Sequence, residues 1–169
     1  MMKILGTTAA VAALALTATP AFAAPVQPDR QATATARIIK PLTLTWVDDL
    51  DLGSITLVDS GPTTVGITRG GVFSCPGTAV TCSCTPKVAR YRITGTNNQS
   101  VTVTAGNVSL VNQADATKTL LLTVDAPASV PLGNSGQSGT EFAIGGSISV
   151  AGSDAEGTYV GTFAVTVDY

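Results

Sequence analysis

The chain has 169 residues, of which 44% are hydrophobic and only 12% are charged, and its formal net charge is −2. It contains no basic cluster, so nucleic acid is not expected as a partner. It also lacks histidine, which removes the commonest general base and the commonest metal ligand. Thr, Ser, Gly, Val and Ala dominate while Glu and Lys are scarce, and this composition favours sheets over helices.

The first residues are typical of a secretory signal peptide. A short basic start, Met1–Lys3, precedes an apolar run over residues 4–18, and Ala21-Phe22-Ala23 provides the small-x-small site that signal peptidases prefer. We therefore predict a signal peptide over residues 1–23, cleaved after Ala23. About 146 residues remain, which suits one domain. Because no second long apolar run follows, no membrane span is expected in the mature chain.

Residues 24–40 are predicted to form an N-terminal lead-in that ends in a strand. Pro25 and Pro28 indicate a flexible start. Small and apolar side chains then occupy every second position, with Thr and Arg between them, and this period of two is typical of a strand. The four alternating residues are Ala32, Ala34, Ala36 and Ile38. Pro41 interrupts the pattern, since proline cannot donate a ladder hydrogen bond.

The main domain is predicted to span residues 41–169 and to begin with the apolar face of Leu42, Leu44 and Trp46. A turn then leads into strands near residues 54–58 and 64–68. Carboxylates in this turn could bind calcium, which prefers several oxygen ligands; they are Asp48, Asp49 and Asp51. Their spacing is not that of a calcium loop and aspartate is ordinary turn chemistry, so no metal site is predicted.

Three cysteines lie within ten residues of one another, in a segment that we interpret as a loop over residues 74–87. In an exported protein they favour one local disulfide and one remaining thiol. Cys75–Cys82 and Cys75–Cys84 are both compatible with the spacing, whereas Cys82–Cys84 would close a small, strained ring. No fourth Cys or His completes a structural zinc site. The unpaired thiol could join two chains.

Further strands are expected at residues 88–94, 100–104, 109–111, 120–124 and 140–150. Gly145-Gly146 suggests a bulge in the longest of them. Residues 127–139 form the longest candidate loop.

The sequence stops on a final alternating strand over residues 158–169, which needs neighbours that hold it firmly. Its half-buried face contains Gly161 together with the larger side chains of Tyr159, Phe163, Val165, Val167 and Tyr169. Many short strands separated by Gly, Asn, Asp and Pro predict an all-β fold, an antiparallel β-sandwich.

No catalytic residue and no cofactor is predicted. A cysteine nucleophile usually needs a histidine as its base, and the chain has none. The sequence also lacks a Gly-x-Ser-x-Gly elbow. We therefore do not expect an enzyme.

Four segments resemble the domain-of-unknown-function 4402 family of bacterial exported proteins, which in turn is similar to spore coat U proteins and to subunits of archaic chaperone–usher pili. The segments are ATATARIIKPLTLTWVDDLDLGSI, ARYRITGTNNQSVTV, FAIGGSISV and GTYVGTFAVTVDY. The turn at Asp49–Gly53 and the final strand are the most specific parts. The cysteine loop departs from the family pattern.

The resemblance implies an immunoglobulin-like sandwich that lacks one strand and a role in an extracellular fimbria or pilus, in adhesion or biofilm formation. A periplasmic chaperone would first cover the resulting groove, an outer-membrane usher would export the subunit to the cell surface, and the N-terminal segment of another copy or related subunit would then fill the groove. Ala32, Ala34, Ala36 and Ile38 would be the inserted side chains. The strand from Tyr159 to Tyr169 would form one wall, with its free carboxylate at the chaperone's anchor.

The alternative is a self-contained secreted or cell-surface domain that binds carbohydrate or matrix. Residues 31–39 would then pair within their own domain, because a strand has the same sequence pattern whether it pairs in cis or in trans. Against carbohydrate binding, the chain has one Trp and three Tyr and no visible aromatic platform.

Overall fold

A computed structural model describes residue 23 and residues 25–27, 29–59, 61–77, 79–83, 85–134 and 138–169. The chain divides into two units, Met1–Ala36 and Arg37–Tyr169. The predicted signal peptide lies almost wholly outside the described residues. In the first unit, the described residues form no strand and are exposed.

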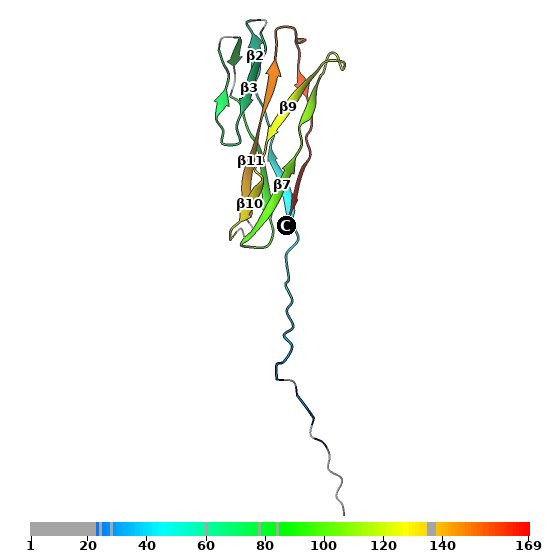
Figure 1. The fold of residues 1–169 in the computed structure, drawn as a ribbon. Coiled ribbons are helices and arrows are strands. Elements are labelled where there is room, and N and C mark those ends of the chain that lie inside the picture. Colours follow the sequence, from blue (N-terminus) through cyan, green and yellow to red (C-terminus); the bar gives the residue numbers. More distant parts are fainter. Residues whose placement is uncertain are drawn as a thin grey trace, which may run out of the picture. The chain divides into compact units, whose positions relative to one another are not determined.

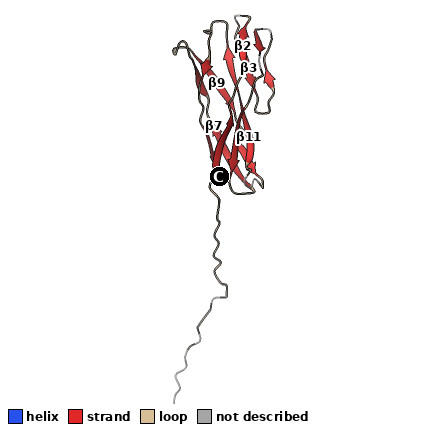
Figure 2. Ribbon diagram, turned by 180° about the vertical axis from the view of Figure 1, so that it is seen from behind, coloured by secondary structure: helices blue, strands red, loops and turns tan. Residues whose placement is uncertain are grey.

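The second unit is an all-β antiparallel sandwich, as predicted, and Figures 1 and 2 show strands and no helix in its described part. The main sheet has the order β1-β6-β11-β9-β8-β12, with β3 beside β11 and β4 beside β3. Its strands are β1 (Thr43–Asp48), β3 (Thr63–Ile67), β4 (Phe73–Ser74), β6 (Ala89–Thr94), β8 (Val108–Asn112), β9 (Thr119–Asp125), β11 (Thr140–Val150) and β12 (Tyr159–Val160).

A small sheet has the order β10-β7-β13, and a separate pair joins β2 to β5. These strands are β2 (Ser54–Leu57), β5 (Val80–Ser83), β7 (Gln99–Ala105), β10 (Ser129–Leu132) and β13 (Val165–Asp168). Five connections pass between the main sheet and the small sheet, namely β6–β7, β7–β8, β9–β10, β10–β11 and β12–β13. The two sheets enclose a common core, because strands of both contribute to the first core cluster.

The core consists of two clusters. The first lies between β6 and β11 of the main sheet and β7 and β10 of the small sheet; its buried residues are Ala89, Ile93, Val101, Val103, Val130, Leu132, Phe142 and Ile144. The second is built from Val65, Val80, Leu122, Ile148 and Val150. Strand β11 contributes to both clusters: its first half pairs with β6 and its second half with β3 and β9.

Two segments interpreted as loops contain strands. The cysteine segment includes β5, whose Val80 is fully buried opposite Leu57. The candidate loop over residues 127–139 includes β10, which pairs with β7. Pro131 is tolerated there because β10 is an edge strand of the small sheet.

The predicted final strand is divided. Strands β12 and β13 are separated by residues 161–164, where the chain passes from the main sheet to the small one. Gly145-Gly146 marks the point at which β11 changes partners, and the register there has no extra residue on β11.

Candidate functional site

Strand β1 is an open edge of the main sheet. Among the described residues it pairs with β6 only, and Leu44 lies opposite the fully buried Ile93. Residues directly opposite each other share a face of the sheet, so Leu44 points toward the core. Leu42 and Leu44 both pack against the first core cluster and both are only half-buried. The edge therefore exposes part of its core-facing side.

Trp46 lies on the same core-facing side, because it is opposite Tyr91, yet 59% of it is exposed. The Tyr91 ring stacks on Phe142 with 5.7 Å between ring centroids, so an aromatic row crosses three strands and ends at Trp46. Burial, and then the negative charge of Asp49, raise the pKa of Tyr91 above its usual value. Trp46 Nε1 donates a hydrogen bond to Asp49 Oδ1 at 3.1 Å, which fixes the indole.

The C-terminal segment forms the second open edge. Odd-numbered side chains from Tyr159 to Val167 are half-buried while even-numbered ones from Thr158 to Asp168 are exposed, which confirms the predicted alternation up to Val167. Tyr169 was predicted on the half-buried face but is 40% exposed. Strand β13 pairs with β7, and its other side has no ladder partner among the described residues. No side chain in this stretch is fully buried.

The two edges border the same core cluster. Leu42 and Leu44 from one side, and Phe163, Val165 and Val167 from the other, all pack against it. We call these five residues and Trp46 the open seam. Of the C-terminal residues selected from the sequence, three lie in this seam. Tyr159 lies instead in β12 of the main sheet, where its hydroxyl donates to the Ala155 carbonyl oxygen at 2.7 Å.

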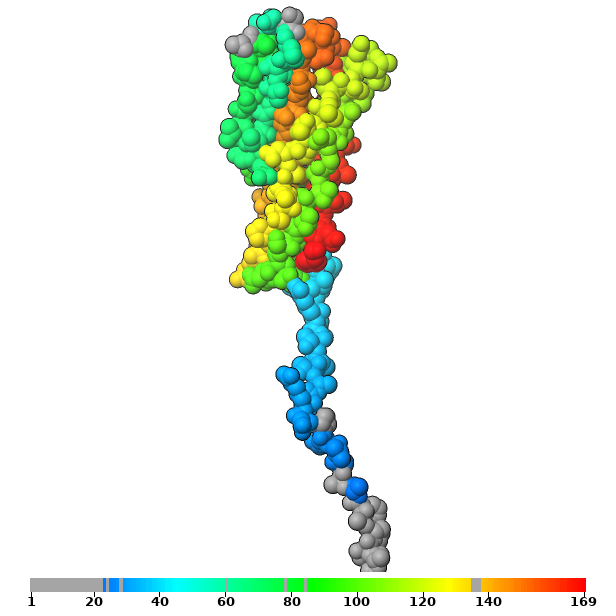
Figure 3. Space-filling model, viewed as in Figure 1, coloured from blue at the N-terminus to red at the C-terminus, as the bar shows by residue number. Residues whose placement is uncertain are grey.

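Tyr169 has a role that the alternation did not reveal. Its hydroxyl oxygen accepts a hydrogen bond from the Thr96 N–H and donates one to the Lys40 carbonyl oxygen, each at 2.7 Å. The Lys40 N–H donates to Thr96 Oγ1 at 2.7 Å. Figure 3 shows the C-terminal residues, in red, next to those near residue 40, in cyan. We call Lys40, Thr96 and Tyr169 the Lys40 clamp.

The predicted donor residues form no strand with any described part of the chain. Ala32, Ala34, Ala36 and Ile38 are all exposed, and 92% of Ile38 is accessible. The structure assigns no strand to residues 31–39, and the pairing of this segment stays a prediction.

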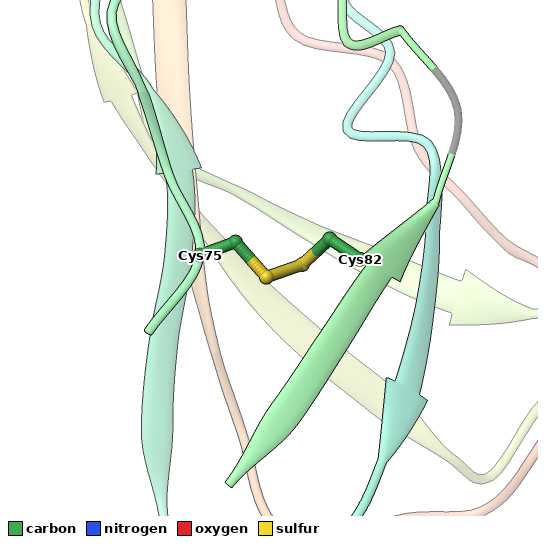
Figure 4. Close-up of a disulfide and its surroundings, with 2 residues drawn as sticks. All are labelled: Cys75 and Cys82. Carbon is green, nitrogen blue, oxygen red and sulfur yellow. A yellow bond between two sulfur atoms is a disulfide. The ribbon is translucent and has the colours of Figure 1, made fainter. Parts of the chain in front are cut away.

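A disulfide joins Cys75 to Cys82, one of the two pairings that the spacing left open (Figure 4). Their Cα atoms are 6.3 Å apart, within the normal range for a disulfide. Both cysteines pack against the second core cluster, so the bond fastens β5 to the segment after β4. Cys84 lies outside the described residues.

The aspartates after β1 serve the turn. Asp51 Oδ1 accepts a hydrogen bond from the Gly53 N–H at 2.8 Å, and Asp51 forms a backbone bridge with Lys87. No group of three or more potential metal ligands gathers within the part of the chain that the structure describes. In that same part, no helix is long and apolar enough to cross a membrane.

The chain was compared with family models, curated proteins and solved structures. No curated protein and no solved structure matches the chain. A family model described as Domain of unknown function (DUF4402) matches residues 42–169, which begin at Leu42 and so contain both edges of the open seam. The chain therefore belongs to the DUF4402 family.

Proposed function

We propose that the protein is a structural subunit of an extracellular fibre, in which residues 31–39 of one copy complete the open seam of the next. The observation that carries this proposal is the exposed core-facing side of β1, above all Trp46, together with the open outer edge of β13, which borders the same core cluster. An open edge with half-exposed apolar side chains can pair with a strand of another chain, because its backbone N–H and C=O groups lack ladder partners. A completed domain would have covered it.

Residues 31–39 have the properties that an added strand needs. They are exposed, they alternate, and the alternating stretch is about as long as β1, which has 6 residues. A strand added between β1 and β13 would gain backbone hydrogen bonds from both edges and would place every second side chain over the seam.

The inserted side chains differ in what they contribute. Each alanine methyl group contributes about 0.8 kcal/mol on burial, and Ile38 about 2 kcal/mol. The three alanines together would therefore contribute about as much as Ile38, and the backbone hydrogen bonds would add to both.

The same physical reasoning extends to export. A subunit with an open seam would aggregate on the way to the surface unless another strand covered it. A periplasmic chaperone that donates such a strand, followed by an outer-membrane usher, would keep the subunit soluble until the next copy replaces the chaperone. The fibre would then stand at the cell surface. In this role the protein carries out no reaction.

Trp46 is the chain's single tryptophan, so its fluorescence reports directly on the seam. We expect a synthetic peptide of residues 29–40, added to protein lacking residues 24–36, to shift the Trp46 emission to shorter wavelength and to protect it from iodide quenching. A peptide with Ala34→Asp serves as the matched control, because it would bury an unpaired charge. Emission that stays unchanged at millimolar peptide contradicts the proposal.

The two faces of the donor segment should respond differently to a charge. In the full-length mature chain we expect Ala34→Asp to reduce assembly at least tenfold, since the carboxylate would enter the seam. Thr35→Asp places the same charge on the opposite face and should leave assembly within about twofold. Sedimentation of assembled material measures both. Equal effects of the two variants would mean that residues 31–39 do not insert with this alternation.

A further inference from the structure

The chain between the donor segment and β1 is attached to the turn between β6 and β7. Lys40 is held at both of its backbone groups, since its N–H donates to Thr96 Oγ1 and its carbonyl oxygen accepts from Tyr169 Oη. Arg37 Nη2 also donates a hydrogen bond to Gln99 Oε1, at the start of β7. Residues 37–40 therefore lie against one end of the domain through contacts with two of its hairpin residues.

The clamp is closely packed as well as hydrogen-bonded. A Cβ atom added at Gly95 would lie 2.7 Å from Tyr169 Oη and 2.8 Å from Leu42 Cδ2, so both side chains rest directly on this glycine. Pro41 restricts Lys40 to an extended backbone. Residues 37–42 contain neither a turn nor a bend.

These contacts bear on how the donor segment can reach a seam. To pair with β1 of its own domain, the chain would have to reverse direction within about residues 39–42. Such a hairpin would displace Lys40 from Thr96 and Tyr169, Leu42 from Gly95 and Arg37 from Gln99. Pairing of residues 31–39 with another copy leaves the contacts of Lys40 and Leu42 in place, because both residues lie outside the inserted segment.

We propose that the Lys40 clamp directs the donor segment to another copy by blocking the hairpin that would fill the chain's own seam. This inference rests on the proposed function and assigns Tyr169 and Thr96 as positioning residues for assembly. Tyr169 thus has a different task from Phe163, Val165 and Val167: they border the seam, whereas Tyr169 sets which chain can enter it.

The test compares Tyr169→Phe with Tyr159→Phe in the full-length mature chain. Each substitution removes one phenolic hydroxyl from the C-terminal segment, but the Tyr159 hydroxyl bonds to Ala155 and not to residues 37–40. Loss of the two Tyr169 hydrogen bonds corresponds to about a five- to thirtyfold change in an equilibrium. We therefore expect Tyr169→Phe to raise the ratio of monomer to assembled protein by about that factor, and Tyr159→Phe to leave it unchanged.

Two measurements on the monomer fraction identify its state. In a self-completed monomer, Trp46 emission is shifted to shorter wavelength and the amide hydrogens of residues 32–36 are protected from exchange. A Tyr169→Phe monomer with exposed Trp46 and unprotected amides contradicts the clamp, whether it is folded or not. Equal monomer fractions in the two variants also contradict it, while leaving the proposed function intact. If the unsubstituted chain remains a monomer with exposed Trp46, the proposed function itself fails.

Discussion

Deletion of residues 24–36 is expected to abolish fibre assembly while leaving the sandwich folded. The deletion removes three of the four alternating donor residues and keeps the Lys40 clamp, because Arg37–Tyr169 forms a compact unit by itself. The truncated chain keeps its open seam and can still accept a strand, but it has none to donate. Electron microscopy and size-exclusion chromatography of the exported protein should show only the monomer or its chaperone complex.

Mixing provides the control for this deletion. Added to full-length protein, the truncated chain should stop growth, because it accepts a donor strand and then offers none. Fibre length should fall as the ratio of truncated to full-length chain rises. A truncated chain that assembles as well as the full-length protein would refute the proposed role of the donor segment. A full-length mature chain that remains a stable monomer without any chaperone would refute the fibre.

The sequence predicted the sandwich well where strands are long and regularly patterned. Residues 140–150 were identified with the bounds that β11 has in the structure, because their apolar positions recur at a period of two or are continuous. β10 was missed, since Pro131 and the surrounding small residues are typical of loops. β5 was missed because the cysteines and a glycine beside it indicated a loop, although Val80 is fully buried. Both segments form strands because they pack against strands that are distant in the sequence, which a local pattern does not show.

Only one of the two edges of the candidate site was predicted from the sequence. The alternation at Phe163, Val165 and Val167 identified the edge at β13, which a period of two can reveal in a single segment. Which strand borders the other side of the seam is a matter of topology, so the exposure of Trp46 on β1 could not be foreseen. The Lys40 clamp was missed for a similar reason. It joins residues 129 positions apart through a hydroxyl on a residue selected for its apolar ring.

Gly145→Ala is expected to be among the most destabilising single-methyl additions in the chain. A Cβ atom at this position would lie 2.2 Å from the Ile67 carbonyl oxygen and 2.5 Å from the Arg69 backbone nitrogen. Both obstacles are backbone atoms, which cannot turn aside as a flexible side chain can. The strand β3 would have to move off β11, and we expect a loss of about 3 kcal/mol or more in the free energy of unfolding. Urea unfolding measures it.

Substitutions at two further glycines serve as controls, with smaller expected losses of stability. At Gly146 the nearest atom to an added Cβ is Leu122 Cδ1 at 2.9 Å, the end of a side chain that can adjust, so Gly146→Ala should cost less. At Gly106 nothing lies within 4 Å and φ is not positive, so Gly106→Ala should stay within about 0.5 kcal/mol of the unsubstituted protein. A Gly145→Ala variant as stable as Gly106→Ala would contradict the close approach of β3 to β11.

The Gly145→Ala substitution should also perturb the open seam, because of where this residue lies in β11. The Arg69 N–H donates to Asp125 Oδ2 at 2.8 Å, and Asp125 pairs with Gly145, so the chain after β3 is held directly over this point. Immediately before Gly145, β11 pairs with β6. Strand β6 in turn pairs with β1, the strand that contains Trp46. Displacement of β3 therefore strains the strand that supports one edge of the seam. We expect Gly145→Ala to weaken donor-peptide binding as well as folding, whereas Gly106→Ala should change neither.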